Sequence, residues 1–202
     1  MTQFIPTPFT KTHTLRWPIV DDKGQPIQQV TMRTLTLAQL RAFRKQFGLD
    51  GDQVSQVQLD AFAGAAICAA SGLTDAERGR LATPDYTSLA QISNALAMTP
   101  AADFKPPAAE AGRIPLLVPV DDIEHGKVDS YRMQPPTVKA TEIVNAAHSG
   151  FDRETHIAAI CSGLDVSTIL TLHMPDWVQL QSEVVNFLEE PAGFYLSTTS
   201  NV

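Results

Sequence analysis

Two runs of β-branched and apolar residues near the start of the chain predict a β-hairpin. Residues 15–20 and 28–34 are rich in such side chains, and the Asp-Asp-Lys-Gly-Gln-Pro segment between them is typical of a turn. Apolar and polar side chains alternate in the second run, so we expect one face of that strand to be exposed to solvent.

From Thr36 onward the apolar residues recur every three or four positions, which predicts amphipathic helices. The first helix should begin after Thr36, whose hydroxyl suits an N-cap, and end at Gly48. A second helix is expected over residues 54–71. It should end at Gly72, because glycine readily adopts the left-handed conformation that a helix C-terminus often requires.

Two shorter sequence signals predict the remaining helices of this half. Residues 74–77 (Thr-Asp-Ala-Glu) form a capping-box sequence, which predicts a short helix to Leu81. Pro84 and Asp85 suit the first turn of a further helix, because proline needs no donor there and a carboxylate complements the helix dipole. We expect that helix to continue to Ala97.

The same pattern recurs later in the chain. Residues 71–96 align without a gap to residues 162–187, and seven of the 26 aligned positions are identical. A repeat of this size indicates a duplicated domain rather than a solenoid unit. The identical pairs are Ser71/Ser162, Gly72/Gly163, Leu73/Leu164, Leu81/Leu172, Pro84/Pro175, Asp85/Asp176 and Leu89/Leu180.

The fronts of the two halves also correspond, although their offset varies. Pro-Ile-Val-Asp-Asp at residues 18–22 resembles Pro-Val-Asp-Asp at residues 119–122. The second half is therefore predicted to begin with a hairpin formed by residues 114–120 and 127–133. Four helices should follow: one that begins after Thr137, one over residues 154–161, one that begins after Asp165 and one that begins at Pro175.

The sequence thus predicts an α+β protein with two homologous small domains, each a β-hairpin followed by three or four helices. A proline- and alanine-rich stretch between them is typical of a linker. The expected boundaries are an N-terminal arm (1–12), a first repeat domain (13–98), a linker (99–113), a second repeat domain (114–190) and a C-terminal tail (191–202).

Charge and composition narrow the function classes. The net charge is −7, and the chain has no basic stripe of the kind that nucleic-acid binders carry. An acidic chain also gains nothing from an anionic membrane, and no apolar run is long enough to span a bilayer. The densest basic stretch, Arg41, Arg44 and Lys45 with Arg33 upstream, is interpreted as a solvated helix face.

The candidate reactive groups do not assemble into a known catalytic or metal-binding motif. His156, Cys161 and His173 could converge on zinc, but a fourth ligand is missing and the first half has no counterparts. Asp85 and Asp176 could form a carboxylate pair, but helix capping or compensation of the helix dipole explains them without catalysis. We therefore expect no enzyme activity, no cofactor and no metal.

Two aromatic residues occupy one position of the repeat and suggest a partner surface. Tyr86 and Trp177 follow the repeated Pro-Asp, and they suit either the core or an interface anchor. The candidate partner-binding residues are Tyr86, Leu89, Trp177, Leu180 and Phe187.

The order of these motifs resembles that of the tail assembly chaperones of Mu-like contractile-tailed phages and prophages. The matching residues are Pro18, Asp22, Gly24, Arg33, Thr36, Gly72, Leu73, Leu81, Asp85 and Leu89 in the first half, and Pro119, Asp122, Gly126, Arg132, Thr137, Gly163, Leu164, Leu172, Asp176 and Leu180 in the second.

The resemblance implies a non-enzymatic protein of the host bacterial cytoplasm. Its implied partners are the tape measure protein and the tail-tube protein, and a homo-oligomer is left open. Members of that family typically carry one copy of this plan, so the tandem arrangement is a departure. The alternative is a structural virion protein of the tail tip or baseplate, located in the virion tail.

Overall fold

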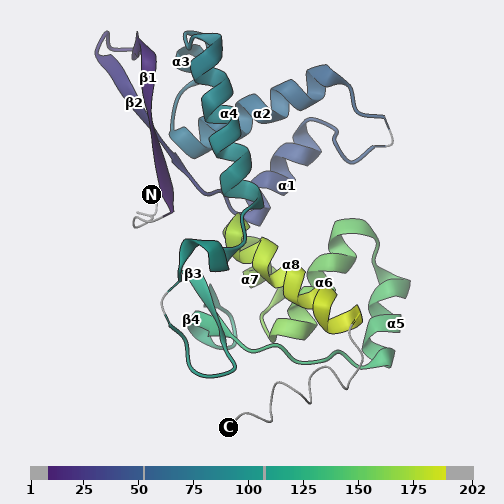
Figure 1. Ribbon diagram of the computed structural model, residues 1–202. Coiled ribbons are helices and arrows are strands. Elements are labelled where there is room, and N and C mark those ends of the chain that lie inside the picture. Colours follow the sequence, from purple (N-terminus) through teal and green to yellow (C-terminus); the bar gives the residue numbers. More distant parts are fainter. Residues whose placement is uncertain (1–8, 52, 107, 190–202) are drawn as a thin grey trace.

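The computed structural model describes residues 9–51, 53–106 and 108–189, and shows a mixed α/β protein (Figure 1). The described part contains two small antiparallel hairpins and eight α-helices. In chain order the elements are β1 (Thr10–Val20), β2 (Pro26–Arg33), α1 (Leu37–Gln46), α2 (Gln56–Ser71), α3 (Asp75–Gly79), α4 (Thr83–Met98), the 3-10 helix η1 (Ala101–Phe104), β3 (Ile114–Asp122), β4 (Gly126–Tyr131), α5 (Val138–Ala147), α6 (Gly150–Ser162), α7 (Val166–Thr171) and α8 (Met174–Glu189).

Each half of the chain has the same element order, a hairpin followed by four helices. The repeated Ser-Gly-Leu ends a helix in both places, as predicted. Gly72 and Gly163 are left-handed C-caps with φ of 78° and 71°. The serine before each glycine donates its hydroxyl to a carbonyl four residues earlier, which satisfies one of the last helical acceptors.

In each hairpin the strand pairing is interrupted by a bulge of four residues, at the equivalent position of the first strand. In the first hairpin the pairing passes from Thr14↔Gln29 to Ile19↔Ile27, so residues 15–18 lie opposite residue 28 alone. In the second it passes from Pro115↔Ser130 to Val120↔Val128, so residues 116–119 lie opposite residue 129. Four residues facing one leave backbone N–H groups without a partner strand.

A carboxylate from the last helix of each half accepts those N–H groups. The Asp85 side chain accepts hydrogen bonds from the backbone of Arg16 and Trp17, both at 3.0 Å. The Asp176 side chain accepts from Leu117 at 2.7 Å and Val118 at 3.3 Å. These aspartates do lie in the first turn of α4 and α8, but their hydrogen-bond partners are the bulges rather than the helix ends.

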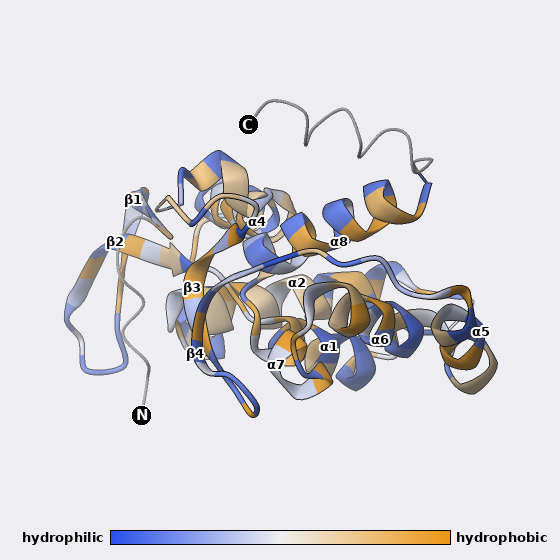
Figure 2. Ribbon diagram, turned by 90° about the horizontal axis from the view of Figure 1, so that it is seen from below, coloured by the Kyte–Doolittle hydropathy of each residue, from blue (hydrophilic) through white to orange (hydrophobic). Residues whose placement is uncertain are grey.

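The apolar side chains gather into one main core in each half. Met32, Ile67 and Leu89 are buried in the first core, where α2 and α4 cover the hairpin. Ile169, Trp177 and Leu180 are buried in the second. Figure 2 shows the amphipathic character of α8, whose ribbon alternates between hydrophobic and hydrophilic bands.

A short stretch of extended chain joins the two halves. The backbone N–H of Leu37 donates to the carbonyl of Leu172, and Met174 donates to Leu35, at 2.9 and 2.8 Å. Thr36 and His173 form the antiparallel bridge between these bonds. Because the side chain of Leu37 also enters the core of the second half, the halves pack as one body, with α4 against α8.

Several predicted boundaries differ from the structure. Helix α6 begins at Gly150 rather than Glu154, and β1 begins at Thr10 rather than Leu15. Part of the expected linker forms η1, in which Ala101 is buried and which contacts α8. Asp165 occupies the N-cap of α7 without a side-chain capping bond. The tail at 191–202 and most of the arm at 1–12 lie outside the described residues.

We expect Asp85→Ala to lower the free energy of unfolding by about 2 kcal/mol, because bulge N–H groups lose their acceptor. Urea denaturation should show this loss, and Asp85→Asn should recover part of it through its remaining carbonyl. Asp103→Ala, an exposed position in η1, is the control and should change stability by less than about 0.5 kcal/mol. Equal effects at Asp85 and Asp103 would contradict this role.

Candidate functional site: an apolar groove between the two halves

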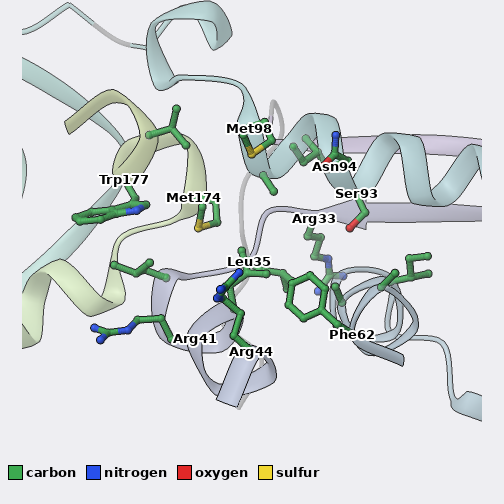
Figure 3. Close-up of a pocket in the computed structure, with 18 of the residues that line it drawn as sticks. Arg33, Leu35, Arg41, Arg44, Phe62, Ser93, Asn94, Met98, Met174 and Trp177 are labelled. Atoms are coloured by element: carbon green, nitrogen blue, oxygen red, sulfur yellow. The ribbon is translucent and has the colours of Figure 1, made fainter. Parts of the chain in front are cut away.

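A groove of about 480 Å³ lies where the two halves meet (Figure 3). Four helices line it: α1, α2 and α4 from the first half and α8 from the second. Phe151 of α6 and the chain from Arg33 to Leu35 complete the lining. Met98 is 64% exposed, so the groove is open to solvent at its α4 edge.

Each of these four helices presents one face to the groove. On α1, α2 and α8 the lining positions are spaced by three and one residues, which is the periodicity of a single helical face. The lining of α4 follows the same spacing and also includes Leu96. The lining residues are Leu37, Leu40, Arg41 and Arg44 on α1; Phe62, Ala63, Ala66 and Ile67 on α2; Ala90, Ser93, Asn94, Leu96, Ala97 and Met98 on α4; and Met174, Trp177, Val178 and Gln181 on α8.

Among the described residues, three arginines are the charged side chains of the lining, and no described aspartate or glutamate contributes to it. Arg33 is exposed at the end of β2, and its side chain has no hydrogen-bond or ion-pair partner among residues 9–51, 53–106 and 108–189. Arg41 and Arg44 lie on α1, across the groove from Asn94 and Met98 in Figure 3. In a chain of net charge −7, this is a local basic site.

Contacts with the second half hold two of the arginines in place. Arg41 forms an ion pair with Asp152 and donates to the hydroxyl of Thr155 at 3.3 Å. The guanidinium groups of Arg41 and Arg44 lie 5.6 and 5.1 Å from the ring centroid of Phe151. The hydrogen bond from Arg41 lowers the pKa of Asp152.

The interpretation of this basic stretch as a solvated helix face is therefore wrong for two of its members. The side chains of Arg41 and Arg44 are 25% and 35% exposed. Leu37, Leu40, Arg41 and Arg44 are spaced i, i+3, i+4 and i+7 and so share one face of α1, a signal that the prediction of a solvated face overlooked. Arg44 forms a local ion pair with Asp50, whereas the partner of Arg41, Asp152, lies 111 positions further along the chain, where no local pattern points to it.

The residues predicted to bind a partner lie mostly in the interior. Leu89 and Leu180 are fully buried, and Trp177 is 2% exposed, with part of its side chain lining the groove. Tyr86 is half-buried against the first core, and Phe187 is half-buried on α8. A partner could touch Leu89 or Leu180 only if the helices separated, so the partner-binding role of these residues stays a prediction.

The two repeated aspartates have opposite pKa shifts. Burial raises the pKa of Asp176 to about 7, against the hydrogen bonds from Leu117 and Val118. Burial also opposes ionisation of Asp85, but hydrogen bonds from Arg16, His13 and Trp17 outweigh it and lower the pKa. His13 Nε2 lies 3.0 Å from Asp85 Oδ1, whereas the corresponding place on β3 holds an isoleucine, Ile114.

The other candidate reactive groups stay apart. Cys68 and Cys161 are free thiols, and burial raises the pKa of Cys161 to about 11. His173 donates or accepts a hydrogen bond with the hydroxyl of Thr34 at 2.7 Å. Within the described residues, histidine, cysteine, aspartate and glutamate side chains form no group of three or more suited to a metal ion.

The first half of the chain matches a known family. Residues 12–97 match the family model described as "Phage tail assembly chaperone proteins, E, or 41 or 14". The matched span begins in β1 and ends in α4, so it covers the first hairpin and the helices that carry most of the groove. Searches of curated proteins and of solved structures returned no match.

The match covers less than half of the chain, and the matched family is described as one of phage tail assembly chaperones. None of the helices in the described residues is both long and apolar enough to cross a membrane.

The raised pKa of Asp176 predicts how stability depends on pH. The pKa is about 7 in the folded protein and 3.8 in the unfolded chain, so the folded state holds more protons between these values. Stability therefore falls as pH rises through this window. Between about pH 5 and about pH 8, wild type should lose on the order of 2 kcal/mol relative to Asp176→Asn.

Urea denaturation of both proteins at each pH measures this difference. Groups that titrate in both proteins cancel in the comparison. A difference that does not change with pH would show that Asp176 is already ionised at the lower pH.

Proposed function

We propose that this protein is a non-enzymatic phage tail assembly chaperone that binds the tape measure protein and assists tail-tube assembly. The match of residues 12–97 to the chaperone family carries this proposal. The apolar groove supports it, because a protein that keeps an extended helical client soluble needs an apolar surface open to solvent.

We also propose that the chain arose by tandem duplication of one chaperone unit, with repeat domains at 13–98 and 114–190. Three features support this: the shared element order, the bulges of four residues facing one, and the aspartates that bind them.

The tail-tube protein is a second proposed partner, and the host bacterial cytoplasm is the proposed site of action.

The two halves do not act as separate modules in this proposal. The junction at Thr36 and His173 fixes them against each other, and the groove takes its walls from both. The duplicated chain is then equivalent to a dimer whose subunits are permanently joined, so assembly of the client site does not depend on protein concentration.

Co-expression with the tape measure protein of the same phage should increase the soluble fraction of that protein. The soluble and insoluble fractions are compared by quantitative gel analysis, with an unrelated acidic protein co-expressed as the control. An unchanged soluble fraction would contradict the chaperone function.

A chaperone should be present during assembly and absent from the finished particle. We expect quantitative mass spectrometry to detect the protein in infected-cell lysate and not in purified virions. A fixed copy number in virions would instead support the alternative function, a structural protein of the tail tip or baseplate.

A further inference from the structure

The groove between the halves has the geometry of a helix bundle from which one helix is missing. Four helices each direct one face into the same space, yet no described element fills it. The lining face of α4 runs from Ala90 to Met98, which is about 12 Å or two helical turns at 1.5 Å per residue. An occupant of similar length is therefore a short helical segment.

The small side chains in the lining favour a helix as the occupant of the groove. Ala63 and Ala66 of α2 face the groove from one side, and Ala90 and Ala97 of α4 line another part of it. Small residues let the backbone of a neighbouring helix approach closely. Leucine or similar side chains spaced i, i+3, i+4 and i+7 on the incoming helix would then reach Phe62 and Met174.

The charged side chains that line the groove indicate which charge the polar face of the bound helix should carry. Arg33, Arg41 and Arg44 contribute to the lining while none of the described aspartates and glutamates does, although the chain has 22 acidic and 15 basic residues. Asp152 already pairs with Arg41 and Asp50 with Arg44, whereas Arg33 has no ionic partner in the described part of the chain. A helix with glutamate or aspartate beside its apolar stripe complements this arrangement.

We infer that the groove is the client site of the chaperone and binds an acidic amphipathic helix. This inference rests on the proposed function, because it names the surface and the chemistry through which the client is held. A second copy of this chain and the chain's own C-terminal segment are the alternative occupants.

The segment beyond Glu189 fits the groove less well in sequence. It reads Glu-Pro-Ala-Gly-Phe-Tyr-Leu-Ser-Thr-Thr-Ser-Asn-Val, and its apolar residues are contiguous rather than spaced by three and four. Its single carboxylate side chain, Glu190, lies next to Pro191. This segment therefore lacks the acidic helical pattern that the arginines complement.

The binding test uses two synthetic peptides and two pairs of variants of the full chain. Both peptides are amphipathic helices with leucine at the a and d positions of repeated heptads, flanked by glutamate in one and by lysine in the other. Ala97→Trp fills the groove from α4, whereas Ala95→Trp adds the same bulk on an exposed position of the same helix outside the lining.

The second pair tests charge. Arg33→Glu reverses the unpaired arginine of the lining, and Lys127→Glu makes the same change in net charge at an exposed position in the second hairpin. Circular dichroism of all four variants establishes that each retains the helical content of the wild type.

Fluorescence anisotropy should show that the glutamate peptide binds wild type and Ala95→Trp equally. It should bind Ala97→Trp at least about tenfold more weakly, a loss of 1.4 kcal/mol or more. Arg33→Glu should weaken binding roughly threefold, and Lys127→Glu should not. Equal binding to Ala97→Trp, or equal binding of the lysine peptide, would overturn the inference.

Two further results would assign the groove to another occupant and so overturn the inference. One is a concentration-dependent dimer in sedimentation velocity that Ala97→Trp abolishes, which indicates a second copy. The other is peptide binding that occurs only after Phe194→Ser and Leu196→Ser, which indicates the chain's own C-terminal segment.

The variants also separate this inference from the proposed function. If wild type and Ala97→Trp keep the tape measure protein equally soluble, the chaperone function stands and the groove is not the client site. If wild type gives no protection, the chaperone function fails, and the anisotropy series alone decides what the groove binds.

Discussion

The fold depends on one interaction that occurs twice: a buried aspartate that accepts the unpaired N–H groups of a bulged strand. A two-stranded hairpin is marginally stable in water and needs a helix to cover it. Asp85 and Asp176 attach each hairpin to the last helix of its half, at the bulge where the hydrogen bonds between the two strands are interrupted. Without this carboxylate, each bulge would leave two backbone N–H donors without their acceptor.

That interaction also determines where the groove can form. The helices that carry the two aspartates, α4 and α8, are those that meet between the halves. Each is attached to a hairpin through its first turn, and the first turn of α8 is also bound to the first half by the backbone hydrogen bond from Met174 to Leu35. The two helices that meet between the halves are therefore each attached by hydrogen bonds in which the main chain takes part.

Local structure was largely predictable from the sequence, and the contacts between distant elements were not. Thr36, Thr74 and Gly72 were predicted as helix caps because capping chemistry involves neighbours a few positions away. The partners of Asp85 lie 68 and 69 positions away, in a bulge whose register no local pattern reveals. The groove was missed for the same reason, since its walls come from four separate helices.

The repeat explains why the groove occurs on one side of the molecule. Positions that maintain the scaffold are the same in both halves, whereas positions that line the groove differ. The α4 lining residues Ala90, Asn94 and Ala97 correspond, 91 positions later, to Gln181, Val185 and Leu188 on α8. If one unit was duplicated, the scaffold interactions persisted because folding requires them. Of the α8 counterparts, Gln181 lines the same groove whereas Val185 and Leu188 are half exposed outside its lining, so two similar halves contribute different side chains to one asymmetric groove.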